Sequence, residues 1–178
     1  MARVELLGPE QVELLVVHMV RLLRDDSTAE YPLSPRGRHR DFDTTAAAEH
    51  RRDRWSRGLE QAGWARAWGV FDGAEIVGHV ELHAGEIFSE RHRGTVGLGV
   101  QANARRRGYA HALMTALIAW AQSQPTIGWI DLGVFAHNHA AERLYRKLGF
   151  VEVARVEDRF RVDEISVTDV QMTLRVDD

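Results

Sequence analysis

Three consecutive arginines stand directly before a glycine in the stretch RRRGYA, residues 105–110. A β-prone run ends just before them, and an apolar pattern with helical spacing begins just behind them. A strand that passes through a glycine turn into a helix directs unpaired backbone N–H groups outward, at the positive end of the helix dipole. Gly108 would let an anion approach the backbone, and Arg105, Arg106 and Arg107 could add charge-assisted bonds. The cluster is therefore either an anion-binding turn or a solvated, basic helix start.

A second set of polar residues, His79, Glu81 and His83, alternates along the stretch HVELHAG. Alternate residues of a strand share one face, so Val80 and Leu82 would take the opposite face. The polar set could supply a general base, or it could hold a metal ion, because alternate strand residues can meet one ion. A metal-dependent hydrolase built on these residues is one hypothesis, and a strand face wetted by solvent is another.

The composition is that of an ordinary globular domain. The chain has 178 residues, of which 44% are hydrophobic and 28% charged, so we expect a single domain over residues 1–178. The absence of cysteine excludes thiolate metal sites, a cysteine nucleophile and disulfides, and it fits a cytoplasmic location. No stretch approaches the ~20 apolar residues of a membrane span, and the start does not resemble a signal peptide, so no membrane partner is expected.

The charge distribution argues against nucleic-acid binding. The formal net charge is −3, so the field of the whole protein does not favour a polyanion. Arginine clusters at 36–40, 91–93 and 105–107 lack the interleaved aromatic residues that single-stranded nucleic acids stack on. We expect no nucleic-acid partner.

The periodicity predicts an α/β fold, a mixed sheet with helices on both faces. The expected elements are a strand at 2–7, a helix at 12–23, a helix begun by Thr44 or Thr45 and ending at Gly63, a hairpin around Asp72-Gly73, a strand at 93–100, a helix at 110–121, a strand at 129–135, a helix at 138–148, and a strand pair at 151–156 and 165–174. Residues 25–43 are predicted to form a long loop, which is either a lid over a site or plain disorder.

Two motifs occur in sequence order. R-x-x-G-x-A at Arg105, Gly108 and Ala110 is followed by V-x-x-x-N-x-x-A-x-x-L-Y-x-K-x-G-F over residues 134–150. Together they resemble the GNAT superfamily of acetyl-CoA-dependent N-acetyltransferases. The resemblance is strong over about residues 92–150, and the flanking elements agree in order only. It implies a GNAT-like sheet, mostly antiparallel, in which the parallel strands 94–100 and 129–135 splay apart to form an acetyl-CoA cleft.

The resemblance also implies which residues hold the cofactor. Backbone groups at the end of the first splayed strand would pair with pantetheine, and the N–H groups of residues 106–110 would bind the diphosphate. The residues implied to contact acetyl-CoA are Leu98, Gly99, Val100, Arg105, Arg106, Arg107, Gly108, Tyr109, Ala110, Asn138, Ala141, Tyr145 and Lys147.

In the family pattern Tyr145 lies near the cofactor sulfur, so we expect its hydroxyl to act as the general acid for the departing thiolate. A core aromatic is the alternative interpretation. Asn138 precedes a helical pattern and could be a helix N-cap, a cofactor contact, or both. Glu81 is the candidate base for the acceptor amine, although no motif carries its position over from the family. The oxyanion would be stabilised by a backbone N–H near Val100.

The acceptor is expected to be a primary amine: an amino acid, another small amine or a protein N-terminus. RHRGTVGLGV and the tail DVQMTL resemble, more weakly, members that acetylate α-amino groups, including ribosomal-protein acetyltransferases. The loop 31–43 and the connection 157–164 would border the acceptor cleft. A non-catalytic acetyl-CoA-binding module is the alternative, and the retained Tyr145 argues against it. No metal is expected, and the edge of the final strand pair could form a homodimer.

Overall fold

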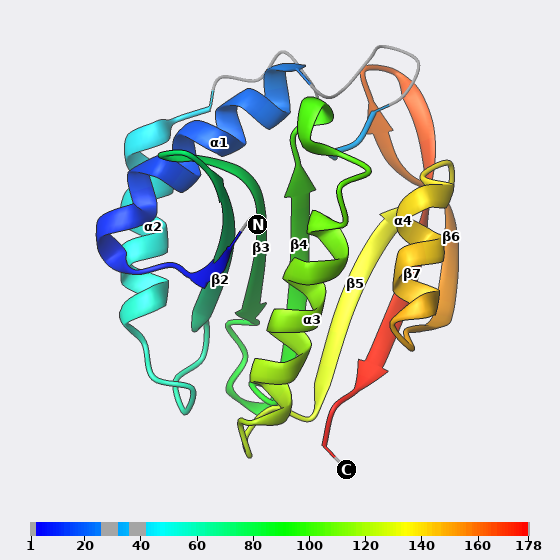
Figure 1. Ribbon diagram of the computed structural model, residues 1–178. Coiled ribbons are helices and arrows are strands. Elements are labelled where there is room, and N and C mark those ends of the chain that lie inside the picture. The colour runs from blue at the N-terminus through cyan, green and yellow to red at the C-terminus, as the bar shows by residue number, and fades with distance from the viewer. Residues whose placement is uncertain (1–2, 26–31, 36–41, 178) are drawn as a thin grey trace.

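The computed structural model of the chain describes residues 3–25, 32–35 and 42–177. Its strands form one mixed sheet in the order β1-β2-β3-β4-β5-β7-β6 (Figure 1). The strands are β1 (Val4–Leu6), β2 (Ala65–Asp72), β3 (Glu75–Ala84), β4 (Arg93–Val100), β5 (Trp129–Phe135), β6 (Val151–Val162) and β7 (Ile165–Arg175). The α-helices are α1 (Val12–Asp25), α2 (Thr44–Ser56), α3 (Tyr109–Gln122) and α4 (His139–Lys147). Of the pairs between these strands, β4 with β5 is the parallel one, so the predicted mixed α/β fold is confirmed.

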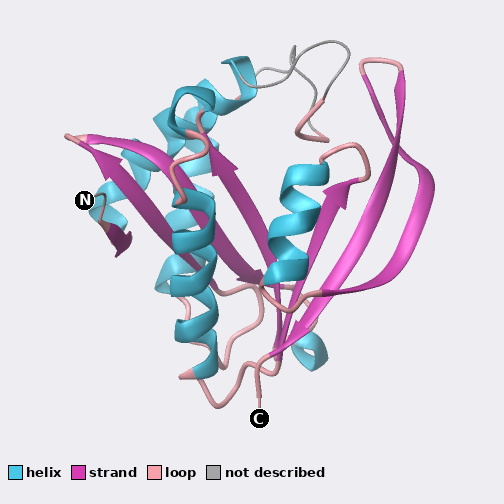
Figure 2. Cartoon of the chain, turned by 45° about the vertical axis from the view of Figure 1, so that its right-hand side comes forward, coloured by secondary structure: helices cyan, strands magenta, loops and turns pink. Residues whose placement is uncertain are grey.

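Helices cover both faces of the sheet (Figure 2). On one face α3 and α4 pack over the main core, which includes Leu82, Leu113 and Ile130. We call this side the α3/α4 face. A second core, which includes Leu15 and Trp55, lies beneath α1 and α2 on the other side, the α1/α2 face.

The alternation predicted for HVELHAG is confirmed. Val80 and Leu82 are fully buried in the core under α3. His79 and Glu81 point to the α1/α2 face, where His79 meets a histidine of α1 and Glu81 meets side chains of α2. Packing against helices, rather than solvent, thus explains the polar residues of this strand.

Helix α2 starts and ends differently from the prediction. Its N-cap is Asp43, whose carboxylate accepts a hydrogen bond from the Ala46 backbone N–H at 2.9 Å, so neither threonine is the cap. The helix ends at Ser56, because Arg57 adopts an extended conformation with φ −69° and ψ 140°. The prediction extended the helix to Gly63, which instead closes a loop with a left-handed φ of 71°.

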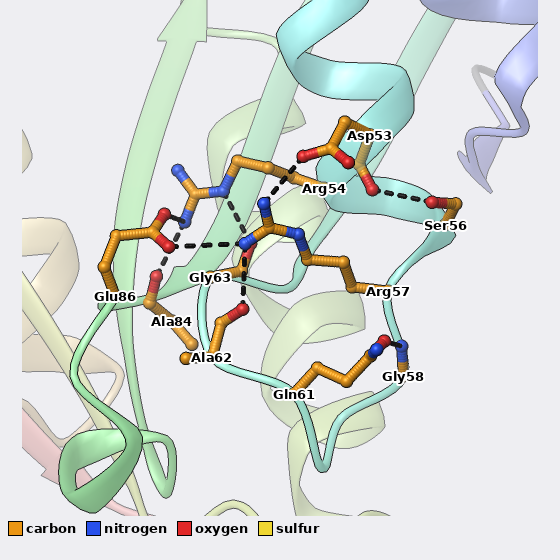
Figure 3. Close-up of polar contacts among 10 residues, drawn as sticks. All are labelled: Asp53, Arg54, Ser56, Arg57, Gly58, Gln61, Ala62, Gly63, Ala84 and Glu86. Carbon is orange, nitrogen blue, oxygen red and sulfur yellow. Dashed lines mark hydrogen bonds and ion pairs between the residues drawn. The ribbon is translucent and has the colours of Figure 1, made fainter.

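Two arginines fix the C-terminal end of α2 against that loop (Figure 3). Arg54 donates from Nε to the Gly63 carbonyl at 2.7 Å and from Nη2 to the Ala84 carbonyl at 2.6 Å. Arg57 donates from Nη1 to the Ala62 carbonyl at 2.9 Å. These bonds hold α2 alongside the end of β3 and so set the position of every side chain that α2 directs at that strand.

The final strand pair is longer than predicted. Strand β6 continues to Val162, through much of the segment 157–164 that was expected to be a connection. Its pairing with β7 is irregular between Val156 and Phe160, and the turn follows at Asp163 and Glu164, both with positive φ. An edge strand tolerates charged residues because one of its backbone edges meets solvent, and a turn without Asn or Gly lacks the usual sequence signal.

Most of the predicted loop at 25–43 lies outside the described residues. In the described part, the Pro32 carbonyl accepts a hydrogen bond from His137 Nε2 at 2.8 Å. This contact ties residues 32–35 to the connection between β5 and α4. None of the helices in the described ranges is long and apolar enough to cross a membrane.

A pair of buried histidines joins α1 to the sheet. His18 Nε2 lies 2.9 Å from His79 Nδ1, and Gln101 Nε2 lies 3.1 Å from His18 Nδ1. An amide N–H can only donate, so this network assigns the proton of His18 to Nε2, from which it is donated to His79. Burial lowers the pKa of His18 to about 4 and lowers the pKa of His79 as well. Both rings are therefore neutral at pH 7.

We expect this pair to make the fold sensitive to acid. The pKa of His18 in the folded chain lies below that of an unfolded histidine, about 6.5, so the unfolded state binds more protons between these values. The stabilisation is complete above about pH 6.5 and is lost as pH falls toward about 4. His18 alone should remove about 2 kcal/mol of unfolding free energy by about pH 5.

Urea denaturation of the wild type and of His18→Gln at about pH 6.5 and about pH 5 measures this loss of unfolding free energy. The variant should lose less stability on acidification, whereas the exposed-residue control His50→Gln should behave like the wild type. Equal pH dependence in wild type and His18→Gln would show that the pair does not titrate as described.

Candidate active site

Strands β4 and β5 separate after a short paired stretch. Their parallel register covers Arg93 with Trp129, Gly94 with Ile130 and Thr95 with Asp131, and no further pair follows. Strand β3 pairs with β4 up to its last residue, and β7 pairs with all of β5. Each strand thus stays with its outer neighbour while the two diverge (Figure 1). The predicted splay is confirmed, and it leaves facing backbone groups of both strands without a partner strand.

Glycines lie on both sides of this opening. Gly97 of β4 and Gly133 of β5 are exposed, and both lie on the α1/α2 face, because their neighbours Val96, Leu132 and Val134 pack into the core on the other side. A Cβ added at Gly97 would meet no atom within 4 Å. A ligand could therefore approach the backbone of both strands closely.

The predicted pantetheine contacts lie at the end of β4. Leu98 and Val100 direct their side chains into the main core, so their backbone groups are what the opening can use. Gly99 lies against α1 and β3: a Cβ there would come within 2.5 Å of Leu22 and 2.9 Å of His79. A larger residue at position 99 would push the strand end away from α1.

The turn RRRGYA leads directly into α3. Arg106 and Gly108 have positive φ, 61° and 81°, and Gly108 is the N-cap of the helix. The first N–H groups of a helix have no carbonyl one turn earlier to bond to, so those at the start of α3 are available to an anion. Arg106 and Arg107 are exposed beside them. The geometry thus supplies the elements of the anion site that the sequence predicts.

Arg105 has a different position from its two neighbours. Its Nε donates to the Val100 carbonyl at 3.0 Å. The guanidinium therefore binds the end of β4 and braces the turn that Arg106 and Arg107 occupy.

Tyr145 lies on α4, the helix that follows β5. Its side chain is 6% exposed and packs against Phe150, with ring centroids 5.9 Å apart. Burial raises the pKa of Tyr145 to about 12, because it disfavours the charged phenolate. The structure shows no hydrogen bond from its hydroxyl to another described residue. The residue is thus both a core aromatic and a phenol that stays protonated at neutral pH.

The other predicted residues of α4 divide by exposure. Asn138 is the N-cap: its Oδ1 accepts a hydrogen bond from the Ala141 N–H at 3.2 Å, which confirms the capping interpretation. Ala141 packs partly against the main core. Lys147 is exposed in the last turn. Whether these residues also contact a cofactor stays a prediction.

Glu81 faces the α1/α2 side in register with Gly97. Its Oε2 accepts from Arg51 Nη2 and its Oε1 accepts from Trp55 Nε1, each at 3.2 Å, and the carboxylate side chain is 15% exposed. A carboxylate offers about four acceptor positions, so Glu81 can still accept a proton. Arg51 and Trp55 belong to α2, whose position the Arg54 bonds fix.

The metal interpretation receives no support from the described residues. His79 is hydrogen-bonded to His18, and Glu81 is engaged with α2. Within the ranges 3–25, 32–35 and 42–177, no group of three histidine, cysteine, aspartate or glutamate residues could hold a metal ion.

Comparison with known proteins agrees with this geometry. The profile of the acetyltransferase (GNAT) family matches residues 20–150. The chain belongs to this family. The match includes the diverging strands, the RRRGYA turn and all of α2, so it begins well before residue 92, where the strong sequence resemblance starts.

Individual relatives of this GNAT chain are distant. The L-amino acid N-acetyltransferase AaaT of Escherichia coli K12 is 30% identical over 76 residues, which are 43% of this chain and 47% of AaaT. The chain thus matches about half the length of this curated relative. An acetyltransferase of the GNAT family from Streptococcus pneumoniae has the same fold, with a TM-score of 0.84, 19% identity and 99% of each chain covered.

Two further solved structures share the GNAT fold. YncA from Salmonella typhimurium, determined with its cofactor acetyl-CoA, gives a TM-score of 0.79 at 15% identity over 100% of this chain and 95% of that one. A ribosomal-protein-alanine N-acetyltransferase from Brucella melitensis gives 0.78 at 16% identity over 97% and 99%.

Sequence reasoning missed two residues beside the opening, Arg51 and Asp169. Arg51 binds the candidate base, and Asp169 of β7 is buried next to Gly133. A signal for Asp169 was present, because Asp169, Gln171 and Thr173 alternate with apolar residues as the polar residues of HVELHAG do. No comparable pattern marks Arg51, which is one of several arginines on α2.

We expect Tyr145 to titrate far from the usual tyrosine range. Because its pKa is raised to about 12, the phenolate absorbance that Tyr145→Phe removes should appear about two pH units above the ordinary value of about 10. The difference between alkaline titrations of wild type and variant isolates this one ring. If the absorbance step that Tyr145→Phe removes were found near pH 10 instead, the hydroxyl would be exposed to solvent.

Proposed function

We propose that the chain transfers the acetyl group of acetyl-CoA to a primary amine by direct attack within a ternary complex. The observation that carries this proposal is the parting of β4 and β5, with a glycine turn into the start of a helix after one strand and a buried, protonated Tyr145 on the helix after the other. Membership of the GNAT family supports acetyl-CoA as the co-substrate.

The cofactor would lie along the opening. Pantetheine would bond to the unpaired backbone of Leu98, Gly99 and Val100 as an added strand does. The diphosphate would bind the N–H groups at the start of α3, from Arg106 to Ala110, with Arg106 and Arg107 adding charge. Asn138, Ala141 and Lys147 would border the cofactor from α4, and Arg105 would act indirectly by bracing the turn.

The chemistry then needs two proton transfers. The acceptor nitrogen, once deprotonated by Glu81 directly or through water, attacks the thioester carbonyl carbon, and a backbone N–H near Val100 stabilises the oxyanion. As the oxyanion collapses, the C–S bond breaks and Tyr145 donates to the departing sulfur. The pKa of Tyr145 lies above that of a thiol, about 8.5, so full transfer of its proton to the free thiolate is uphill; the hydroxyl would stabilise the departing sulfur by donating a hydrogen bond, and any phenolate formed would regain its proton from water. The products are the N-acetyl amine and CoA.

The α-amino group of an amino acid or of a protein N-terminus is the acceptor class that we propose. The names of two relatives support it, an L-amino acid N-acetyltransferase and a ribosomal-protein-alanine N-acetyltransferase. We also propose a cytoplasmic location and a homodimer. The edge strand β6, with Val151 and Val153 exposed, is the surface that would pair two copies.

Calorimetry with acetyl-CoA, followed by a thiol-release assay over pooled primary amines, tests the proposal directly. Binding with release is expected, and binding without release from any pool would favour a non-catalytic module.

If the chain is active, Tyr145→Phe should lower kcat by about 100-fold or more, the usual contribution of a general acid. Its affinity for acetyl-CoA should stay near the wild-type value, and an unchanged kcat with chemistry rate-limiting would remove Tyr145 from this role.

Gly108→Asp should weaken acetyl-CoA binding by about tenfold or more, because it places a carboxylate where the diphosphate would approach the start of α3. Gly73→Asp is a matched control: Gly73 also has positive φ, 61° against 81°, and an added Cβ meets nothing within 4 Å at either position. Asp tolerates this conformation better than most residues. Equal Kd values for acetyl-CoA in the two variants would place the diphosphate elsewhere.

A further inference from the structure

Asp169 is a buried carboxylate that the chemistry above does not use. It lies on β7 directly across from Phe135 of β5, and it is 6% exposed. Its side chain leans along the sheet over Gly133, because a Cβ added at Gly133 would come within 2.8 Å of Asp169 Oδ1. Gly133 is exposed beside the opening. The carboxylate therefore lies at the β5 side of the opening, on the α1/α2 face.

The charge of Asp169 is weakly compensated within the protein. Among the described residues its carboxylate takes part in no ion pair. The side chains of Gln171 and Arg159 lie near enough to favour its charged form, and neither forms an ion pair with it. Burial raises the pKa of this carboxyl above its usual range despite both contacts. A buried carboxylate with no adjacent cation costs stability, so it gains more from a cationic ligand than a solvated one does.

Glu81, the carboxylate on the other side of the opening, has an ion-pair partner of the kind that Asp169 lacks in the part of the chain that the structure describes. Glu81 faces the same side of the sheet, next to Gly97 of β4, but both of its oxygens accept hydrogen bonds from α2 and one of them faces a guanidinium. Three strand spacings separate β3 from β7, and β4 and β5 diverge between them, so the two carboxylates are more than roughly 15 Å apart across the opening. The side at Glu81 has an ion-pair partner in Arg51, and the side at Asp169 has none among the described residues.

Glycine makes this position accessible. With any other residue at position 133, the Cβ would collide with the Asp169 carboxylate. The same glycine leaves the backbone of β5 bare beside it, so a small group could contact both the carboxylate and the backbone edge. Asp169, Gly133 and the unpaired edge of β5 thus form one surface next to the position proposed for the acetyl group.

We propose that Asp169 binds the ammonium group of the acceptor and so selects acceptors that arrive as cations. The inference rests on the proposed acetyl transfer. Amines with reference pKa values of about 7.7 for an α-amino group and about 10.4 for an alkyl amine are mostly protonated at pH 7, so the enzyme first meets a cation. Asp169 holds that cation beside the opening, and the proton then leaves to water, which can relay it to Glu81 across the opening, before the nitrogen attacks.

The first test is Asp169→Asn, which keeps the size of the side chain and removes its charge. With L-amino acids, a peptide that has a free N-terminal alanine, and putrescine as probes, KM for the best acceptor should rise by about tenfold or more. KM for acetyl-CoA should change by less than about twofold, and Tm should stay equal or rise because a buried charge is gone. A residue with a merely structural role would lower Tm and leave the acceptor KM unchanged.

Asp72→Asn is the matched control, because it also removes one carboxylate, at the exposed end of β2, and keeps a sequence that favours the turn that follows. It should leave both KM values unchanged. An acceptor KM in Asp169→Asn that matches this control would overturn the inference.

A second measurement does not depend on turnover. In aspartate-labelled protein, the carboxyl carbon resonance of Asp169, assigned by its absence in Asp169→Asn or by sequential NMR assignment, should shift saturably with n-propylammonium chloride and not with sodium chloride. No saturable shift would overturn the inference. A saturable shift without thiol release from any amine would support the ammonium site and contradict the proposed acetyl transfer.

Discussion

Beyond Thr95 and Asp131 the facing backbone groups of β4 and β5 have no strand partner, and the rest of the site depends on this break in the ladder. An unpaired edge inside a sheet is stable only if each strand is held from its other side. Strand β3 holds β4 in that way and β7 holds β5. Because α3 starts soon after β4 ends and α4 soon after β5 ends, each of the two diverging strands is followed by the start of a helix.

The fold was predictable wherever a local pattern determines it. The strands at 93–100 and 129–135 and the helix between them follow from periodicity and from the glycine turn, and the structure has them at nearly the same bounds. The errors occur where tertiary contacts or edge position decide. Helix α2 ends where Arg54 and Arg57 bond to the following loop, and β6 carries charged residues into a strand because it is an edge strand.

The residues of the candidate site were likewise predictable where a local motif marks them and not where tertiary packing brings them in. The two motifs locate the turn at Gly108 and the helix that carries Asn138 and Tyr145, because each is continuous in sequence. Arg51 and Asp169 reach the site from α2 and β7, far from either motif, and only the packing of those elements brings them there. The same packing gives Arg105 a contact that the sequence does not predict, since its bond to the Val100 carbonyl depends on how the chain turns after β4.

The strand order has a consequence for how the chain folds during synthesis. Strand β7 is made after β6 but lies between β5 and β6. Until β7 has emerged, β5 has only its three pairs with β4, and β6 has no neighbour in the sheet. Domains generally fold as units on the ribosome once their contacts can form. The half of the sheet next to α4 is therefore completed only when β7 inserts, and until then the nascent chain exposes an unpaired β5 edge.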